Sequence, residues 1–507
     1  MTTNNQAMRI YVEYFVVAAG LFITAPCLGT LAQWRAVVAA LAILLILFRW
    51  QTSEPPDLTK RPLADSGLWL TVLLPFSLLT GGNSYGHGGF YTFVEIVCNQ
   101  TLMLSLAVIF KVRNVFTDAL SVAYAAALLA ILTELSFPFI VLTSLVTAST
   151  FNYAVTSLSS YSPKSFTLGE LILTCQGLTT FVVMSGCSLA CRIAYKSGCI
   201  LQCTSSAGFL QAGLFSLAVF VAAVTKIHAL RRPPWFYVGL FLSAFTLVYP
   251  LCWIMVNTEP VAWLLYHCFN NYKRFCLMCS WMFLSTMAGL FAYWYSSVYS
   301  NSSTVVRKVF HGAIVSVFLP GVVFDPDLMY LACGAILGVF VLLELFRTLS
   351  IPPIGQNIED AFAMFLDEKD AGAFVLTPVY LFVGCAASVL LFPGQFAEPR
   401  SVLILLSGTV ALGIGDTAAS VVGSKLGKHH WPGTQKTVEG TLAAVIAQFV
   451  FYLPLVFTAA PTVWHLNTAA LVVVLCLGSC LEAFTTQVDN LALPFYVYPM
   501  MTALYAS

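Results

Sequence analysis

The sequence predicts an all-α, polytopic integral membrane protein with about 15 transmembrane helices. Of its 507 residues, 59% are hydrophobic and only 9% are charged. A soluble globular chain carries about 25% charged residues, so this chain could not cover its surface in water. Its net charge of +1 gives no overall field that would attract a nucleic acid. These observations exclude a soluble multidomain protein and a nucleic-acid partner, and they favour a bundle of helices surrounded by membrane lipids.

Apolar runs separated by short polar breaks define the expected helices in chain order. The candidate spans lie near residues 10–31, 36–49, 66–80, 89–110, 116–134, 135–155, 166–190, 206–225, 236–256, 276–298, 308–324, 328–346, 373–393, 401–416, 441–460, 467–484 and 490–505. Several runs are shorter than the roughly 20 residues that cross a bilayer, so we expect fewer spans than runs. Residues 1–9 are polar, and insertion by an internal signal anchor is expected.

Lysine and arginine residues in the loops predict which ends of the helices face the cytosol. The candidate cytosolic groups are Lys111/Arg113, Arg192/Lys196, Arg231/Arg232 and Lys273/Arg274, together with Lys425, Lys428 and Lys436. The last three lie in the longest basic loop of the C-terminal half, and we expect this loop to face the cytosol.

Charge is distributed unevenly and divides the chain into two parts. Residues 301–440 hold 19 of the 45 charged side chains (8 Lys or Arg and 11 Asp or Glu) in 140 of the 507 residues. A charge in or beside a membrane span costs about 2.5–3.5 kcal/mol, so such residues are usually functional or paired. We therefore expect an N-terminal transmembrane bundle at 1–300 and a C-terminal catalytic transmembrane bundle at 301–507.

The strongest motif is the segment 413–441, GIGDTAASVVGSKLGKHHWPGTQKTVEGT, between two apolar runs. Asp416, Ser420 and Gly423 are spaced to share one face of a helix. Pro432-Gly433 predicts a turn that leads into the next helix. Backbone N–H groups at a helix N-terminus suit phosphate oxygens, and an acid across the loop suits the Mg²⁺ of a nucleotide. The alternative is a cytosolic loop whose glycines serve turns.

This segment is not a Walker A loop. Gly423-Ser-Lys-Leu-Gly427-Lys428 is one residue short of that motif, and His429 replaces the required Ser or Thr. The spacing excludes a P-loop kinase.

Four shorter motifs place charged residues elsewhere in the C-terminal part. They are Arg307-Lys308-x-x-His311, Glu344-x-x-Arg347, Asp367-x-x-Asp370-x-Gly372 and Glu482-Ala-x-Thr485-x-x-x-Asp489-Asn490. The basic motif suits a transferring phosphoryl group or a membrane anchor, and the Glu-Arg motif suits a simple i, i+3 ion pair. The Asp367–Asp370 run is a metal site or a solvated acidic loop. Glu482, Thr486 and Asp489 are spaced to share one helical face.

Together these motifs resemble the dolichol kinase family of CTP-dependent polyprenol kinases. GDTAAS (415–420) and WPGTQKTVEGT (431–441) resemble its cytidine-nucleotide loop, and the four shorter motifs occur in the family's order. The resemblance covers about 301–500, whereas the first 300 residues share only a hydrophobic, many-spanned character. WPGTxKTxEGT is specific to this kinase group, but the GD…S element is shared with phosphatidate cytidylyltransferases and related lipid kinases.

The resemblance implies a multi-pass protein of the endoplasmic reticulum membrane whose active site faces the cytosol. Its activity would be transfer of the γ-phosphoryl group of CTP to the terminal hydroxyl of dolichol, giving dolichyl phosphate, the glycan lipid carrier of protein glycosylation, and CDP. The implied cofactors are CTP as donor and Mg²⁺ or another divalent cation. Dolichol and membrane lipids are the implied partners, and no protein partner can be inferred.

The site residues that the resemblance implies fall into two groups. Those for CTP are Trp431, Pro432, Gly433, Thr434, Gln435, Lys436, Thr437, Glu439, Gly440, Thr441 and Ser420. Those for catalysis are Asp416, Asp370, Asp489, Lys436, Arg307 and His311. The three aspartates are also the expected metal ligands, and one of them would accept the dolichol proton. The assignment among the three stays open.

Two other classes of function remain as alternatives. The nearer is a CTP-dependent kinase of diacylglycerol or phytol, or a phosphatidate cytidylyltransferase-like enzyme. The other is a transporter, which the many spans would suit. Transporters are often built from structural repeats, but no convincing second copy of the 413–441 segment is found here.

Overall fold

The computed structural model describes residues 3–24, 31–53, 64–85, 89–195, 201, 203–299, 303–363, 373–394, 396, 398–459 and 464–506. Over these residues the protein is all-α, and the one pairing outside helices is an isolated bridge between His430 and Thr437. The prediction of an all-α protein is therefore confirmed. Asp367, Asp370 and Gly372 lie outside the described residues.

The first part of the chain forms twelve α-helices among the described residues. They are α1 (Thr3–Thr24), α2 (Leu31–Ser53), α3 (Leu73–Tyr85), α4 (Gly89–Ile109), α5 (Val115–Leu132), α6 (Phe137–Tyr161), α7 (Leu168–Tyr195), α8 (Ser205–Lys226), α9 (Pro233–Ser243), α10 (Tyr249–Val256), α11 (Pro260–Phe269) and α12 (Tyr272–Val298).

The second half mixes long helices with short ones. They are α13 (Ser303–Phe324), α14 (Pro326–Thr348), α15 (Gly355–Ala363), α16 (Thr377–Leu390), α17 (Ser401–Leu405), α18 (Ser407–Thr409), the π-helical segment η5 (Val410–Asp416), α19 (Thr417–Leu426), α20 (Val438–Ala459), α21 (Trp464–Phe484) and α22 (Asp489–Tyr505).

Eleven helical segments of the described residues are long and apolar enough to cross a bilayer, with α9 and α10 acting as one segment. The expected count of about 15 spans is not confirmed, because several apolar helices are shorter than the roughly 20 residues that a span needs. The shorter ones include Thr377–Leu390 and Thr468–Phe484. The run expected at 401–416 is broken into α17, α18 and η5.

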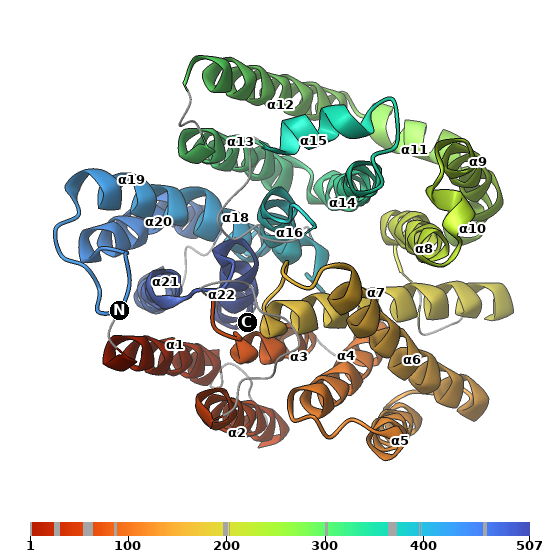
Figure 1. Ribbon diagram of the computed structural model, residues 1–507, viewed down its shortest axis with the longest axis horizontal. Helices are drawn as coiled ribbons and strands as arrows, with labels where there is room; N and C mark the ends of the chain where they lie inside the picture. Colours follow the sequence, from red (N-terminus) through yellow and green to blue (C-terminus); the bar gives the residue numbers. More distant parts are fainter. Residues whose placement is uncertain are drawn as a thin grey trace.

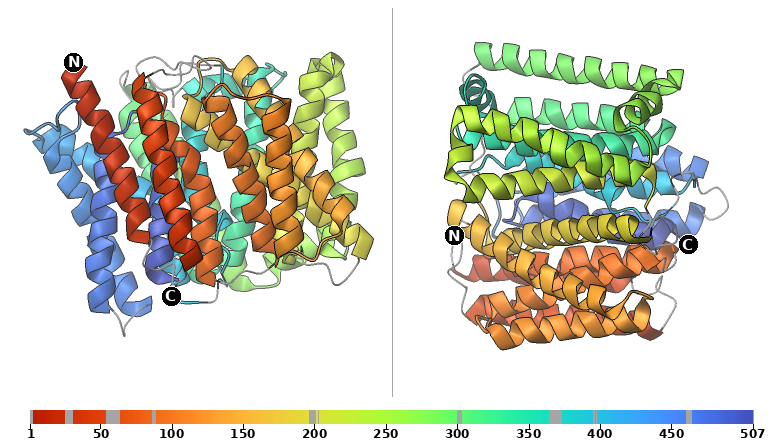
Figure 2. Two further views of the ribbon diagram at one scale, coloured as in Figure 1. Left: turned by 90° about the horizontal axis from the view of Figure 1, so that it is seen from below. Right: turned by 90° about the vertical axis from the view of Figure 1, so that its right-hand side faces the viewer.

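Helix α22 lies at the centre of the C-terminal half (Figure 1). It packs against α1, α3, α16 and α21, and all of its residues except Asp489 and Leu504 are fully buried. The large core also includes residues of α3, α4 and α7, so the N-terminal helices and the C-terminal helices share one buried interior. The helices run side by side across the thickness of the molecule (Figure 2). The division at residue 300 stays a prediction.

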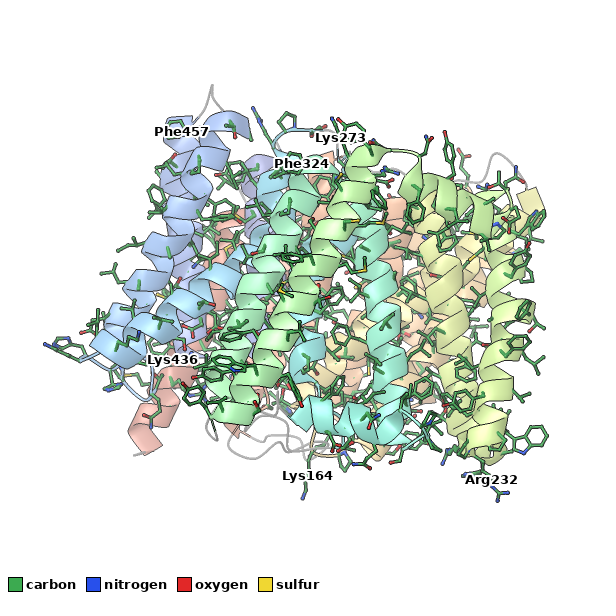
Figure 3. The ribbon with its side chains drawn as sticks, turned by 90° about the horizontal axis from the view of Figure 1, so that it is seen from above. Lys164, Arg232, Lys273, Phe324, Lys436 and Phe457 are labelled. Atoms are coloured by element: carbon green, nitrogen blue, oxygen red, sulfur yellow. The ribbon has the colours of Figure 1, made fainter. Side chains whose placement is uncertain are left out.

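The helix ends define two faces of the bundle. Lys436, Lys164 and Arg232 lie toward one end, and Lys273, Phe324 and Phe457 lie at the other (Figure 3). The expectation that Arg231/Arg232 and Lys273/Arg274 are both cytosolic is therefore wrong for one of the two groups. Arg274 donates from Nε to Asp325 at 2.6 Å, which gives this arginine a structural partner. The charged end with Lys436 is called the Lys436 end below.

Candidate active site

Three carboxylates meet near the Lys436 end of the bundle. Oxygens of Asp416, Glu482 and Asp489 all lie within 4.8 Å of one another. Asp416 and Glu482 are buried, and Asp489 is half-buried. Oxygen ligands of this kind are those that Mg²⁺ prefers. We call Asp416, Glu482 and Asp489 the carboxylate cluster.

The polypeptide brings these acids together from three elements. Asp416 ends η5, Glu482 lies in the last turn of α21, and Asp489 begins α22. Sequence spacing suggested one continuous helical face for Glu482 and Asp489, and this interpretation is wrong because the helix breaks at 485–488. The two acids approach one another through the resulting turn. Glu482 itself was not among the predicted metal ligands.

The π-helical segment η5 sets the position of Asp416. Wider π-type turns inside α-helices occur frequently at functional sites. A Cβ atom on Gly413 would overlap Val315 Cγ2 of α13, so this close approach requires glycine. Helix α13 also carries the basic motif, and the contact therefore brings its side chains to Asp416.

Two lysines and a histidine surround the acids. Lys308 Nζ donates to Asp416 Oδ2 at 2.7 Å and to its carbonyl oxygen at 3.3 Å. His311 Nδ1 donates to the Arg307 carbonyl at 2.6 Å, which directs Nε2 to within 3.2 Å of Asp416 Oδ2. Lys308 belongs to the predicted basic motif, but it was not among the predicted catalytic residues.

Lys436 reaches the cluster from the loop before α20 and forms an ion pair with Glu482. Partial desolvation would lower the pKa of Lys436, but the negative charges of Glu482, Asp489 and Asp416 outweigh it and raise this pKa above its ordinary value. The ammonium group therefore stays charged at neutral pH. Three carboxylates with Lys308 and Lys436 leave a formal charge of −1, which a divalent cation would offset.

The loop 427–437 folds as predicted around Pro432-Gly433. Gly433 has a φ of 75°, which favours glycine, and Thr434 N donates to the Trp431 carbonyl at 3.2 Å across the turn. Trp431 N donates to the Lys436 carbonyl at 3.0 Å. The turn thus brings Lys436 back toward the membrane helices.

Several residues that were predicted to bind CTP instead make contacts within this loop and the start of α20. Trp431 Nε1 donates to Thr441 Oγ1 at 2.9 Å, and Gly440 N donates to Thr437 Oγ1 at 3.2 Å. Glu439 pairs with His429 Nδ1 at 2.6 Å. Two early N–H groups of α20, those of Val438 and Gly440, already have partners within the loop.

The other predicted loop residues are more accessible. Pro432, Gln435 and Lys436 are exposed, while Gly433 and Thr434 of the loop and Ser420 of α19 are partly exposed. Among the described residues of the loop, Lys436 is the one whose side chain makes an ion pair with the carboxylate cluster.

The turn between Glu482 and Asp489 is held by residues of the N-terminal part. Arg9 Nη1 donates to the Phe484 carbonyl at 3.0 Å, and Val488 N donates to Glu170 Oε1 at 2.8 Å. Asp65 accepts from Thr486 Oγ1 at 3.0 Å and from Gln487 Nε2 at 2.7 Å, and it pairs with Arg9. The sequence reasoning missed this brace.

A signal for the brace was present in the sequence. Arg9, Glu13 and Glu170 lie within or at the start of apolar runs, where charges are rare and usually paired or functional. In the folded protein all three are buried, and Arg9 lies 3.6 Å from Glu13.

Comparison with known proteins decides the family. The model of the family described as dolichol kinase matches residues 139–459, which is more than half of the chain. The chain belongs to the dolichol kinase family. The resemblance drawn from the motifs is therefore confirmed.

Relatives from animals and fungi carry the same name. A dolichol kinase of Homo sapiens is 31% identical over 364 residues, 67% of this chain and 66% of that protein. Dolichol kinase sec59 of Schizosaccharomyces pombe is 26% identical over 461 residues, 86% of this chain and 84% of that protein. The alignment with the human protein thus covers just under two thirds of its length. No solved structure matches the chain.

The dolichol kinase family match includes η5, α19, the loop and α20, but it ends before Glu482 and Asp489. Those two acids lie outside the matched region, but the fold brings them close to Asp416, which lies within it.

The Glu344-Arg347 motif lies elsewhere and forms the expected ion pair at 2.7 Å. Arg347 also pairs with Glu359 of α15 at 2.9 Å, and Glu344 accepts from Val375 N at 3.1 Å. The motif therefore ties α14 to α15 and to the segment before α16.

Proposed function

We propose that this protein is a CTP-dependent dolichol kinase. It transfers the γ-phosphoryl group of CTP to the terminal hydroxyl of dolichol and gives dolichyl phosphate and CDP. The observation that carries this proposal is the carboxylate cluster with Lys308 and Lys436 at one end of a membrane bundle, in a chain of the dolichol kinase family. Phosphoryl transfer needs this combination, because it relies on positioning and on neutralising phosphate charge.

The residues of the cluster fit a divalent cation. Three carboxylates within 4.8 Å form a hard oxygen ligand set, and their excess of one negative charge over the two lysines favours a cation. We assign Asp416, Glu482 and Asp489 as the residues that would hold Mg²⁺. When bound, Mg²⁺ supplies charge neutralisation for the β- and γ-phosphates.

The chain's own residues supply the remaining functions. Lys436 and Lys308, with Arg307 beside it, neutralise the phosphates at the Lys436 end of the bundle, and the loop 427–437 with Ser420 positions the nucleotide. The dolichol oxygen attacks the γ-phosphorus, its proton passes to a carboxylate of the cluster, and the bond from the γ-phosphorus to the bridging oxygen breaks to release CDP. Lys308 and His311 hold Asp416 in place for this step.

The membrane setting suits a lipid alcohol. The polyprenyl chain remains among the helices and lipids, while only the hydroxyl needs to reach the cluster. We place the Lys436 end on the cytosolic side of an endoplasmic reticulum membrane. The basic residues Lys164, Arg232 and Lys436 at that end support this orientation. Residues 301–507 carry the catalysis, and residues 1–300 brace the acid-bearing turn.

A labelling experiment tests the proposal. Membranes containing the protein are incubated with dolichol, phytol or diacylglycerol and with CTP labelled at the γ- or the α-phosphate, or with γ-labelled ATP. We expect label in dolichol from γ-labelled CTP alone. Transfer of the α-label to lipid would indicate a cytidylyltransferase, and no label in any lipid would overturn the assignment as a lipid kinase.

A further inference from the structure

A cavity lies directly against the carboxylate cluster, between η5, α20, α21 and α22. Its polar lining consists of Asp416, Glu482, Gln448 and Ser479, and the rest of the wall is small or aliphatic, including Leu475 and Val497. Ser479 precedes Glu482 by three residues on α21, so it lies about 4.5 Å deeper along the helix axis, away from the Lys436 end. The cavity therefore leads from the acids toward the interior of the bundle.

Gln448 and Ser479 present two complementary groups at this cavity. Both residues are buried, at 5% and 3% exposure. Gln448 Nε2 donates to the Ala444 carbonyl at 3.1 Å and to Ser479 Oγ at 3.2 Å, which occupies both of its N–H groups. Within the described part of the chain, no hydrogen bond reaches Gln448 Oε1, and the Ser479 hydroxyl proton has no acceptor. An acceptor, Gln448 Oε1, and a donor, the Ser479 hydroxyl, are therefore both available to a group that enters the cavity.

The chemistry of the wall selects a neutral alcohol. A hydroxyl group can donate to Gln448 Oε1 and accept from Ser479 Oγ at the same time. The lining includes two carboxylates and no lysine or arginine, which disfavours a phosphate group.

The polar pair is also held close to the reacting acids. A Cβ atom on Gly415 would lie 2.7 Å from Gln448 Nε2, so the residue before Asp416 leaves room for the Gln448 amide. A hydroxyl bound by Gln448 and Ser479 would therefore lie beside Asp416, one of the three carboxylates assigned to the metal.

We propose that Gln448 and Ser479 form the acceptor subsite, which binds the terminal hydroxyl of the polyprenol. This inference rests on the proposed kinase function, and it assigns to α20 and α21 the recognition of the lipid alcohol.

Kinetics of the purified full-length protein test the subsite. In Ser479→Ala and Gln448→Leu, we expect the KM for dolichol to rise about fivefold to tenfold, because each change removes one hydrogen bond to the alcohol. The KM for CTP should stay within about twofold of wild type. An unchanged KM for dolichol in Ser479→Ala, or equal rises in both KM values, would overturn the proposal.

A second glutamine–serine pair provides a matched control. Gln176 of α7 donates from Nε2 to Ser105 Oγ of α4 at 3.2 Å, and neither residue lines the cavity. Gln176→Leu and Ser105→Ala should leave both KM values unchanged, and a rise in the dolichol KM there would show that any such buried pair has this effect. Wild-type protein that transfers nothing to dolichol would refute the proposed function itself, whereas active wild type with unaltered variants refutes only the subsite. Ser479→Ala, the smaller change, gives the test if Gln448→Leu fails to fold.

Discussion

Glu482→Gln should separate metal binding from folding. The substitution keeps the size of the side chain but removes one of three carboxylates, so the formal charge of the cluster with its two lysines changes from −1 to 0. Lys436 loses its charged partner, but its side chain is 44% exposed and water can replace that partner. We therefore expect a loss of at most about 1 kcal/mol in the free energy of unfolding.

The effect on catalysis should be much larger. Removing one electrostatic stabiliser of a transition state typically lowers kcat by about 10²–10³-fold, or about 2.7–4 kcal/mol. Initial rates at saturating CTP and dolichol, measured across a Mg²⁺ titration, should show a kcat about 100-fold lower and a half-saturating Mg²⁺ concentration at least about tenfold higher. Thermal unfolding of the same preparation measures the stability.

Glu259→Gln is the matched control for this substitution. Glu259 caps α11 by accepting from Val261 N at 3.1 Å, and it lies outside the carboxylate cluster. Its variant should keep the wild-type kcat and Mg²⁺ dependence. If Glu482→Gln is folded and shows the same kcat and Mg²⁺ dependence as wild type, the assignment of Glu482 to the metal site is refuted.

Two further substitutions test the surroundings of the cluster. Lys308→Met removes the ammonium group 2.7 Å from Asp416 and should lower single-turnover phosphoryl transfer by about 100-fold, and an unchanged rate would contradict its role. The two carboxylate oxygens of Glu170 accept from the backbone N–H groups of Thr167 and Val488, and Glu170→Gln replaces one of these acceptors with an NH₂ group. The turn before Asp489 should loosen, and Mn²⁺ binding should weaken about tenfold. Equal Mn²⁺ affinity in Glu170→Gln and wild type would show that the brace does not position the acids.

The helical class of the protein follows from its composition. A chain with 9% charged residues has to satisfy its backbone hydrogen bonds inside a bilayer, and bundled helices do this. Helix α20 (Val438–Ala459) lies close to the expected run at 441–460. The number of spans was harder to predict, because hydropathy does not reveal where an apolar run breaks into short helices, as at Ser401–Asp416.

Only some residues of the candidate site, and not its geometry, could be predicted from the sequence. The motifs pointed to Asp416, Asp489 and Lys436, which the fold brings together. The approach of Glu482 to Asp489 depends on a turn that contains Thr486. The side chain of Thr486 donates a hydrogen bond to Asp65, which lies 421 residues earlier in the chain. Local periodicity cannot encode such a contact. It therefore suggested a continuous helix where the chain actually turns.

Binding of Mn²⁺ in the place of Mg²⁺ tests the central claim, which is that Asp416, Glu482 and Asp489 hold a divalent cation. Electron paramagnetic resonance can follow a Mn²⁺ titration of the purified protein without CTP or lipid, so the readout does not depend on activity. We predict a site in the wild-type protein that is lost in the folded triple variant Asp416→Asn/Glu482→Gln/Asp489→Asn. Mn²⁺ binding of equal affinity and stoichiometry in that variant would contradict the account.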